Sequence, residues 1–322
     1  MSLKHLFHFS VRARITVLAL GLALPPLILV SALGLSALGR ARDMAVQAST
    51  DALHTQAEEN LARWAADKAQ LYDAKLARVY DQVETVADYV RAAPASAPTS
   101  SADRVWIAPN GPTAAALHDH AAAVERARGY VPLLHSSVDH AEIVSLGYVA
   151  LEDGGVVAFD RDIIDVLDDI KPFDVRTRSW YIAARDSGKT VWVDTYVDAN
   201  TKQLTTTCAA PLYDQNGAFL GVVGFDVLLD TIRQDILAID TAPDGSAFLI
   251  NERGDVLVNN EMPAEGGRWD QPLVAENLLQ DPNPQLRAVA ERMIRAEQGV
   301  VRMTLQNRDV YLAFAPITTA GW

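Results

Sequence analysis

The chain begins with a long apolar segment. Residues 15–39 contain no charged side chain over 25 positions, and about 20 suffice for a helix to cross the hydrocarbon core of a bilayer. Pro25 and Pro26 interrupt the segment, but a membrane helix can accommodate them as a kink. We predict an uncleaved transmembrane anchor, with residues 1–14 in the cytoplasm and the rest of the chain outside. A cleaved signal peptide usually has an apolar run of only about 7–15 residues, although small residues at 36–41 leave cleavage open.

Residues 40–93 follow a different pattern. They contain no glycine or proline and are dominated by good helix formers, so we predict one helix on the order of 70–80 Å long. Apolar residues at three- and four-residue steps form a single stripe along it: Leu61, Trp64, Val79, Val83, Val86 and Val90. The stripe packs either against the folded domain or against a second copy in a homodimer, and the sequence does not separate these alternatives.

Short strand patterns begin after a Pro/Ser/Ala-rich segment at 92–101, which ends the helix. The strand-like runs are residues 145–151, 155–159, 189–196, 204–213 and 218–227. Turn residues separate the first two runs and the last two, which predicts two hairpins, and a helix is predicted at 227–239.

A second, smaller cycle follows. Its predicted elements are a hairpin at 246–251 and 256–259, a helix at 284–297 and a strand pair at 300–305 and 310–317. Hairpins and helices in this order predict an α+β fold of two modules built on antiparallel sheets, at 94–240 and 241–322. The last strand runs almost to the end of the sequence, so we expect the chain to be part of a longer protein.

Charge and composition narrow the class of function. Residues 1–42 carry +5 and the whole chain −13, so residues 43–322 carry −18. An acidic globular part argues against nucleic acid as a partner, because phosphate contacts need clusters of Lys and Arg. The single cysteine, Cys208, cannot form an internal disulfide and is predicted to be a small buried hydrophobe. No phosphate loop, nucleophile elbow or metal-ligand pattern occurs, so we predict neither a cofactor nor an enzyme in this chain.

The densest group of potential ligand-binding residues lies at 173–181, which includes Arg178, Trp180 and Tyr181. Further on, Trp192, Asp194 and Tyr196 alternate along a predicted strand and should share one of its faces, and Asp226 lies near the end of another strand. An arginine can hold a carboxylate through two parallel hydrogen bonds, an aspartate can accept from an ammonium group, and aromatic rings can wall a cation. These parts suit an α-amino acid, but on composition alone the favoured interpretation is core aromatics with Arg178 paired to a nearby aspartate.

Four motifs in order change that balance: RSWY at 178–181, VWVDTY at 191–196, APLYDQNG at 210–217 and GVVGFD at 221–226. Together with the preceding long helix, they make residues 100–322 resemble a double Cache (dCache) domain. The resemblance implies two stacked PAS-like modules outside the membrane, with a ligand pocket in the membrane-distal one, at 94–240.

An amino-acid-binding subgroup of that family implies roles for single residues. Arg178 and Trp180 fall on its carboxylate-binding positions, with Tyr181 beside them, and Tyr196 and Asp226 fall on the positions that hold the ligand's amino group. One departure is Phe173, where the pattern has a tyrosine, and Asp226 lies one residue later than the commonest spacing. Asp194 is added to the candidate set because it alternates with Trp192 and Tyr196 along the predicted strand.

These observations predict a receptor: an inner-membrane anchor holding an extracytoplasmic sensor for a small ligand, an amino acid or a related amine or carboxylate. The effector is missing from the chain, and the resemblance allows a histidine kinase, a PP2C-type phosphatase, a cyclic-dinucleotide enzyme or a chemotaxis transducer. A second membrane span is expected beyond residue 322. The alternatives are an anchored external hydrolase and a ligand-free domain that only dimerises through its helix.

Overall fold

The computed structural model describes residues 11–92, 106–107, 129–158, 163, 166–167, 170, 173–237, 245–259, 267–305 and 307–322. It divides into two compact units, residues 1–60 and 61–322. One helix, α1 (Val11–Ala92), contributes to both. No break separates the predicted membrane segment from the predicted second helix, because α1 continues through residue 39 and includes Pro25 and Pro26.

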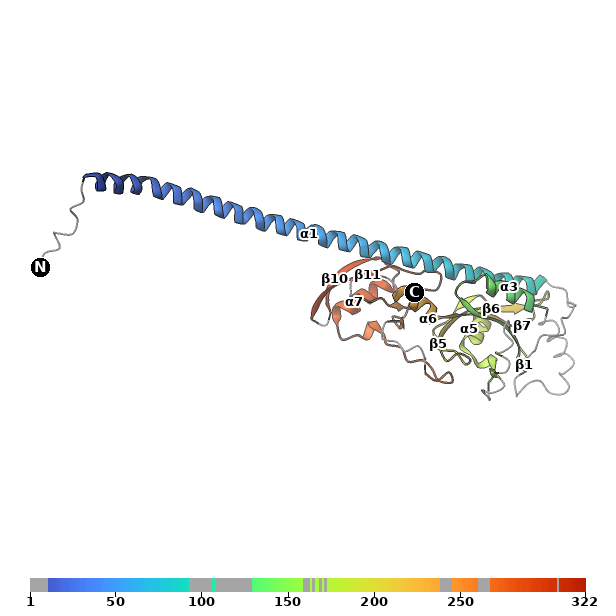
Figure 1. Cartoon of the computed structure of the whole chain (residues 1–322). Helices are drawn as coiled ribbons and strands as arrows, with labels where there is room; N and C mark the ends of the chain where they lie inside the picture. The colour runs from blue at the N-terminus through green and yellow to red at the C-terminus, as the bar shows by residue number, and fades with distance from the viewer. Residues whose placement is uncertain are drawn as a thin grey trace. The chain divides into compact units, whose positions relative to one another are not determined.

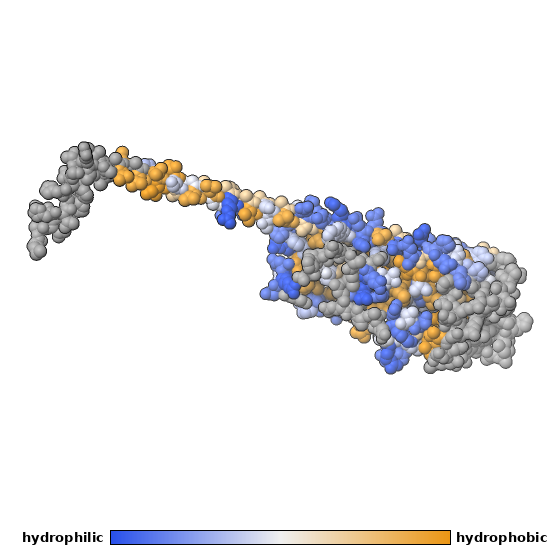
Figure 2. Space-filling model, in the orientation of Figure 1, coloured by the Kyte–Doolittle hydropathy of each residue, from blue (hydrophilic) through white to orange (hydrophobic). Residues whose placement is uncertain are grey.

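The first unit is the N-terminal part of α1. Within the described part of the chain, α1 is the one helix that is long and apolar enough to cross a membrane. Its large apolar side chains between Leu20 and Leu38 are exposed, and apolar surface covers this part of the helix in Figure 2. Exposed apolar area of this extent marks a surface that contacts something other than water.

The second unit is built on an antiparallel sheet, with seven strands among the described residues (Figure 1). The strand order is β1 (Trp106–Ile107), β3 (Gly155–Ala158), β2 (Val144–Leu151), β7 (Phe219–Leu228), β6 (Leu204–Tyr213) and β4 (Val191–Trp192), and β5 (Tyr196–Val197) also pairs with β6. The two predicted hairpins are confirmed as β2–β3 and β6–β7. In the second turn, Asp214 accepts from the backbone N–H groups of Asn216 and Ala218, and Gly217 takes a φ of 82°.

The two faces of this sheet carry different helices. Residues 61–92 of α1, α3 (Val131–Asp139) and α6 (Leu229–Leu237) contribute to the core on one face. The 3₁₀ helix η1 (Val175–Thr177) and α5 (Ser179–Ser187) contribute to the core on the other. Strand side chains alternate between the two cores: Cys208 and Ala210 point toward α1, whereas Ala209 points toward α5. Cys208 is free and fully buried, as predicted.

The apolar stripe of α1 packs against the sheet. Val79, Val83, Val86 and Val90 are buried there, and the stripe continues toward the N-terminus through Leu76, Tyr72 and Ala69. Trp64, which we expected in the stripe, is 43% exposed instead. The buried side of α1 therefore continues through Leu76, Tyr72 and Ala69 and does not include Trp64. Of the two alternatives for the stripe, the structure displays packing against the folded domain.

The predicted strand at 189–196 is interrupted, and this corrects one expectation. Trp192 pairs with Cys208, and Tyr196 pairs with Thr205. The four residue steps from Trp192 to Tyr196 therefore lie opposite only three steps on β6, from Cys208 to Thr205. Such an extra residue reverses the alternation of side chains, as in a β-bulge. Trp192 therefore packs in the core beside α1, whereas Tyr196 packs in the core beside α5, and the prediction that they share one face is wrong.

The C-terminal part has its own core. Its elements are β8 (Leu249–Ile250), β9 (Val256–Val258), η2 (Leu278–Gln280), α7 (Pro284–Met293), β10 (Gly299–Leu305) and β11 (Arg308–Phe314). β8 pairs with β9 and β10 with β11, both antiparallel, as predicted. The Asn283 side chain caps α7 by accepting from the N–H groups of Gln285 and Leu286. The α+β class is thereby confirmed, while the expected domain boundaries at 93–94 and 240–241 fall outside the described residues.

Candidate ligand-binding site

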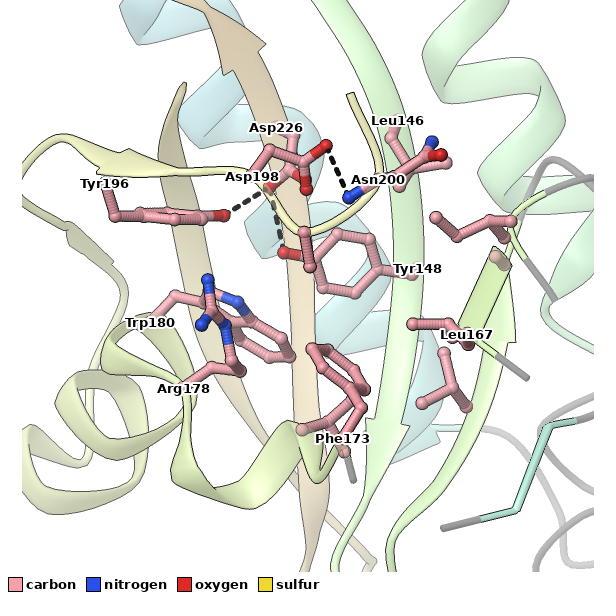
Figure 3. A pocket seen from close by; sticks show the side chains of 15 residues that line it. Leu146, Tyr148, Leu167, Phe173, Arg178, Trp180, Tyr196, Asp198, Asn200 and Asp226 are labelled. Carbon is pink, nitrogen blue, oxygen red and sulfur yellow. Dashed lines mark hydrogen bonds between the residues drawn. The ribbon is translucent and has the colours of Figure 1, made fainter. Parts of the chain in front are cut away.

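A cavity lies on the α5 face of the sheet (Figure 3). Its volume is about 450 Å³ with the open mouth included. Its lining is mostly apolar, with a few polar groups that point inward: Tyr148, Arg178, Tyr196, Asp198, Asn200 and Asp226. This combination is typical of a pocket that orients a small ligand by a few polar contacts.

Asp226 is the buried centre of the polar group. It lies on β7, between Leu146 of β2 and Thr207 of β6 in the sheet register. Its Oδ1 accepts from the Tyr148 hydroxyl at 2.8 Å and from the Thr207 hydroxyl at 2.7 Å. The Tyr196 hydroxyl lies 2.7 Å from Thr207 Oγ1 and 3.3 Å from the same Oδ1. Neutral hydroxyls from three strands therefore converge on one carboxylate oxygen.

A glycine makes room for this arrangement. Gly224 pairs with Tyr148 across β7 and β2, and a Cβ at residue 224 would lie 2.7 Å from the Tyr148 ring. Real Cβ atoms do not approach other atoms so closely, so any larger residue would displace the ring. The Tyr148 ring also packs against Trp180, with centroids 4.9 Å apart. Gly224 and Trp180 together hold the hydroxyl of Tyr148 on Asp226.

Burial raises the pKa of Asp226 to about 7, with the nearby charge of Asp198 adding to the effect. The hydrogen bonds from Thr207, Tyr148 and Tyr196 act in the opposite direction because they stabilise the charged form. Burial and the Asp226 charge raise the pKa of both tyrosines well above 10. The tyrosines thus stay neutral donors while Asp226 is poised between its two protonation states.

Arg178 supplies the positive group of the cavity. Its Nη1 donates to the carbonyl of Trp269 at 3.0 Å and its Nη2 to the carbonyl of Val197 at 3.3 Å. The guanidinium carbon lies 5.2 Å from the ring centroid of Tyr196 and 5.9 Å from that of Phe173. Over the described ranges of the chain, no ion pair joins Arg178 or Asp226 to an opposite charge. The expectation that Arg178 pairs with a nearby aspartate is therefore wrong for these residues.

The structure brings five of the seven predicted site residues to the cavity lining, and these are Phe173, Arg178, Trp180, Tyr196 and Asp226. Tyr181 is buried beside them but does not line the cavity; its ring packs edge-on against Trp180 and Phe219. Asp194 lies outside, 54% exposed, and forms an ion pair with Arg253 at the β8–β9 turn. Asp194 therefore does not share the cavity with Tyr196.

Three polar lining residues were missed by the sequence reasoning: Tyr148, Asp198 and Asn200. Tyr148 could have been suspected as a hydroxyl among apolar residues on a predicted strand, but only the pairing of β2 with β7 brings it to Asp226. The carboxylate of Asp198 accepts from the backbone N–H groups of Asn200 and Thr201. The turn that begins at Asp198 follows β5 directly. An aspartate at such a position is a local signal for an Asx-turn, but it does not indicate that the residue lines a cavity.

The structure combines an antiparallel sheet with a cavity on one face and the long helix α1 on the other. The Cache domain model (dCache_1) matches residues 49–322, so this chain belongs to the Cache domain family. The resemblance drawn from the four sequence motifs is confirmed at the level of the family.

Relatives of known class share part of the chain. The methyl-accepting chemotaxis protein McpA of Pseudomonas putida is 35% identical over 155 residues, which is 47% of this chain and 21% of that protein. The methyl-accepting chemotaxis protein PctB of Pseudomonas aeruginosa is 37% identical over 87 residues, 27% of this chain and 14% of that protein. The chain thus matches about a fifth or less of the length of these relatives.

Two solved structures share the fold. The ligand-binding domain of the amino-acid chemoreceptor PctC of Pseudomonas aeruginosa, in complex with GABA, has a TM-score of 0.53 at 19% identity and covers 81% of this chain and 93% of its own. The extracellular domain of the putative histidine kinase mmHK1S-Z3 also has a TM-score of 0.53, at 14% identity, and covers 82% and 90%. At these identities the likeness establishes the fold alone.

Proposed function

We propose that the cavity binds a small zwitterion, an amino acid or a related amine or carboxylate. The guanidinium of Arg178 holds the ligand's carboxylate. The Asp226 carboxylate and the Tyr196 hydroxyl both accept hydrogen bonds from the ligand's ammonium group. Trp180, Phe173 and Tyr181 shape and support the pocket. The observation that carries the proposal is that the Asp226 carboxylate and the Arg178 guanidinium line one cavity. Among the described residues, neither group forms an ion pair with the other or with any other charged side chain.

Burying a charge without a partner is costly. In the unbound cavity, Asp226 avoids part of this cost by taking up a proton, since its pKa is raised to about 7. Arg178 cannot lose its proton and is instead supported by two carbonyls and two lining aromatic rings. A ligand with a carboxylate and an ammonium group supplies both missing charges at once.

The rest of the cavity favours an apolar ligand side chain. The lining residues without polar side-chain atoms include Leu146, Val156, Ala158, Ile163, Leu167 and Val175. A polar side chain placed against them would lose hydrogen bonds to water without replacing them. Among amino acids, those with branched aliphatic side chains are the best match to this surface.

We place the cavity in the membrane-distal module, at 94–240, of an anchored receptor. The apolar, exposed stretch of α1 supports an inner-membrane span, and the partial matches to chemotaxis receptors favour a chemotaxis transducer over a kinase as effector. A second span beyond residue 322 and a homodimer formed through α1 complete the proposal, and no catalytic role is assigned to this chain.

Calorimetry of the full chain in detergent against the 20 common amino acids tests the ligand class. The wild type is expected to bind at least one aliphatic amino acid, and Arg178→Ala is expected to lower its affinity about 100-fold or more, because a buried charge loses its partner. Arg176→Ala is the matched control, since Arg176 is two residues away but pairs with Asp174. Absence of binding by all 20 contradicts the amino-acid form of the proposal.

A further inference from the structure

Trp269 lies beside Arg178, yet it comes from a distant part of the sequence. It follows β8 and β9 in the C-terminal part of the chain, and 91 positions separate it from Arg178. The backbone carbonyl of Trp269 accepts from Arg178 Nη1 at 3.0 Å. The indole ring of the same residue lies 5.7 Å from the guanidinium carbon. One residue thus contacts the cationic group of the cavity through both its main chain and its side chain.

The indole is fixed on other sides as well. The Phe173 ring packs against it with centroids 5.7 Å apart and planes tilted by 58°. The Lys202 ammonium lies 5.7 Å from the same indole centroid. Phe173 and Arg178 line the cavity, and Trp269 is half-buried against both cores of the sheet. The indole therefore packs as part of the wall that supports the guanidinium.

The contacts of Arg178 leave room for a ligand. A guanidinium has five N–H donors, and the carbonyls of Trp269 and Val197 take one on each Nη. The remaining donors include Nε–H and one N–H on each Nη, enough for two parallel bonds to a carboxylate. A flexible arginine loses side-chain freedom when it binds, whereas a guanidinium already held in place loses less.

We propose that Trp269 is a ligand-positioning residue of this pocket: its carbonyl and indole hold the Arg178 guanidinium in the orientation that accepts a ligand's carboxylate. The inference rests on the proposed function, in which Arg178 binds a carboxylate. It adds that the pocket is completed by a residue from outside the range of the predicted distal module.

The arrangement also links ligand binding to the C-terminal part of the chain. A second contact joins the same two regions, since Asp194 in the segment between β4 and β5 pairs with Arg253 at the β8–β9 turn. If the contact with Trp269 raises the affinity of Arg178 for a ligand by some factor, the bound ligand must stabilise the contact between Trp269 and Arg178 by the same factor. Trp269 is thus one contact through which occupancy of the cavity can act on the C-terminal part.

The test compares two probes on the full chain in detergent: L-leucine, and 3-methylbutylamine, which has the same ammonium group and branched tail but no carboxylate. Trp269→Ala is expected to weaken L-leucine binding about tenfold, the effect of losing one cation–π contact and the carbonyl's fixed position. It is expected to change the affinity for the amine less than twofold. Trp269→Phe, which keeps a ring, is expected to restore most of the affinity for L-leucine.

Arg268→Ala is the matched control, because Arg268 pairs with Asp270 at the surface and should leave both affinities unchanged. Equal loss of both probes in Trp269→Ala overturns the positioning role, since it indicates general damage to the pocket. Unchanged L-leucine affinity in Trp269→Ala overturns it as well. If the wild type binds neither L-leucine nor any other amino acid, the proposed function fails and this inference fails with it.

Discussion

The hydroxyl of Tyr148 donates to Oδ1 of Asp226 over 2.8 Å, from a strand 78 positions earlier in the sequence. The register of β2 and β7 places Tyr148 opposite Gly224, two residues before Asp226 on the same side of β7. The tyrosine ring therefore lies over the glycine and its hydroxyl reaches the carboxylate diagonally. This hydrogen bond acts to lower the pKa of Asp226, against the larger effect of its burial.

Tyr148→Phe is expected to raise the pKa of Asp226 above its value of about 7, because a donor to the charged form is lost. The affinity for an aliphatic amino acid at pH 7 should then fall about tenfold and recover partly at pH 9. Calorimetry at both pH values measures this. Tyr213→Phe, at the far end of β6, should leave the affinity unchanged, and an equal loss at both pH values would contradict the electrostatic explanation.

Ligand affinity should depend on pH through Asp226. Binding of an ammonium group requires the ionised carboxylate, and the pKa of Asp226 in the unbound protein is about 7. Below that value a proton competes with the ligand, so affinity should fall by about tenfold for each pH unit. Titrations between pH 5 and pH 9 measure the slope. A flat profile over this range, or an Asp226→Asn variant that still binds, is incompatible with the role assigned to Asp226.

Gly224→Ala should disturb the cavity and the fold together. The added Cβ would lie 2.7 Å from the Tyr148 ring, and overpacking of this kind costs roughly 1–3 kcal/mol of unfolding free energy. Thermal unfolding should detect the loss, and amino-acid affinity should fall because the Tyr148 hydroxyl leaves Asp226. Gly34→Ala, where nothing lies within 4 Å, is a control expected to unfold at the wild-type temperature.

Asp73 joins α1 to the C-terminal turn, because it accepts from the backbone N–H of Thr319 at 2.7 Å. Burial acts to raise the pKa of Asp73, but hydrogen bonds from Thr319 and Thr318 outweigh it and the net shift is downward. The stability from this lowered pKa is present above the ordinary value of 3.8 and is lost as the pH falls below it.

Asp73→Ala should lower the unfolding free energy by about 1–3 kcal/mol at pH 7 and by less at pH 3. Denaturant unfolding at the two pH values measures this difference. Asp88→Ala is the comparison, since the Asp88 carboxylate pairs with Arg91 at the surface of α1, and a similar loss in both variants would argue against a specific role of Asp73.

Much of the local structure followed from short-range patterns. The hairpin with the turn at 214–217 was predicted because Asp, Asn and Gly suit its backbone, and the burial of Cys208 followed from its apolar neighbours. The face of the β4–β5 segment did not follow. One extra residue between Trp192 and Tyr196 reverses which core each enters, and nothing in the local composition marks such a bulge.

The class of fold, the long helix with its apolar N-terminal part and the residues of the family motifs were predictable from the sequence, because helix propensity, alternation and turn chemistry act over a few neighbouring residues. Which of the candidate residues meet depends on the tertiary structure. It brought Tyr148 and Trp269 to Asp226 and Arg178, and it directed Asp194 to Arg253. These contacts join residues separated by 59 to 91 positions. They depend on strand register and on the packing of separate cores, which no local pattern encodes.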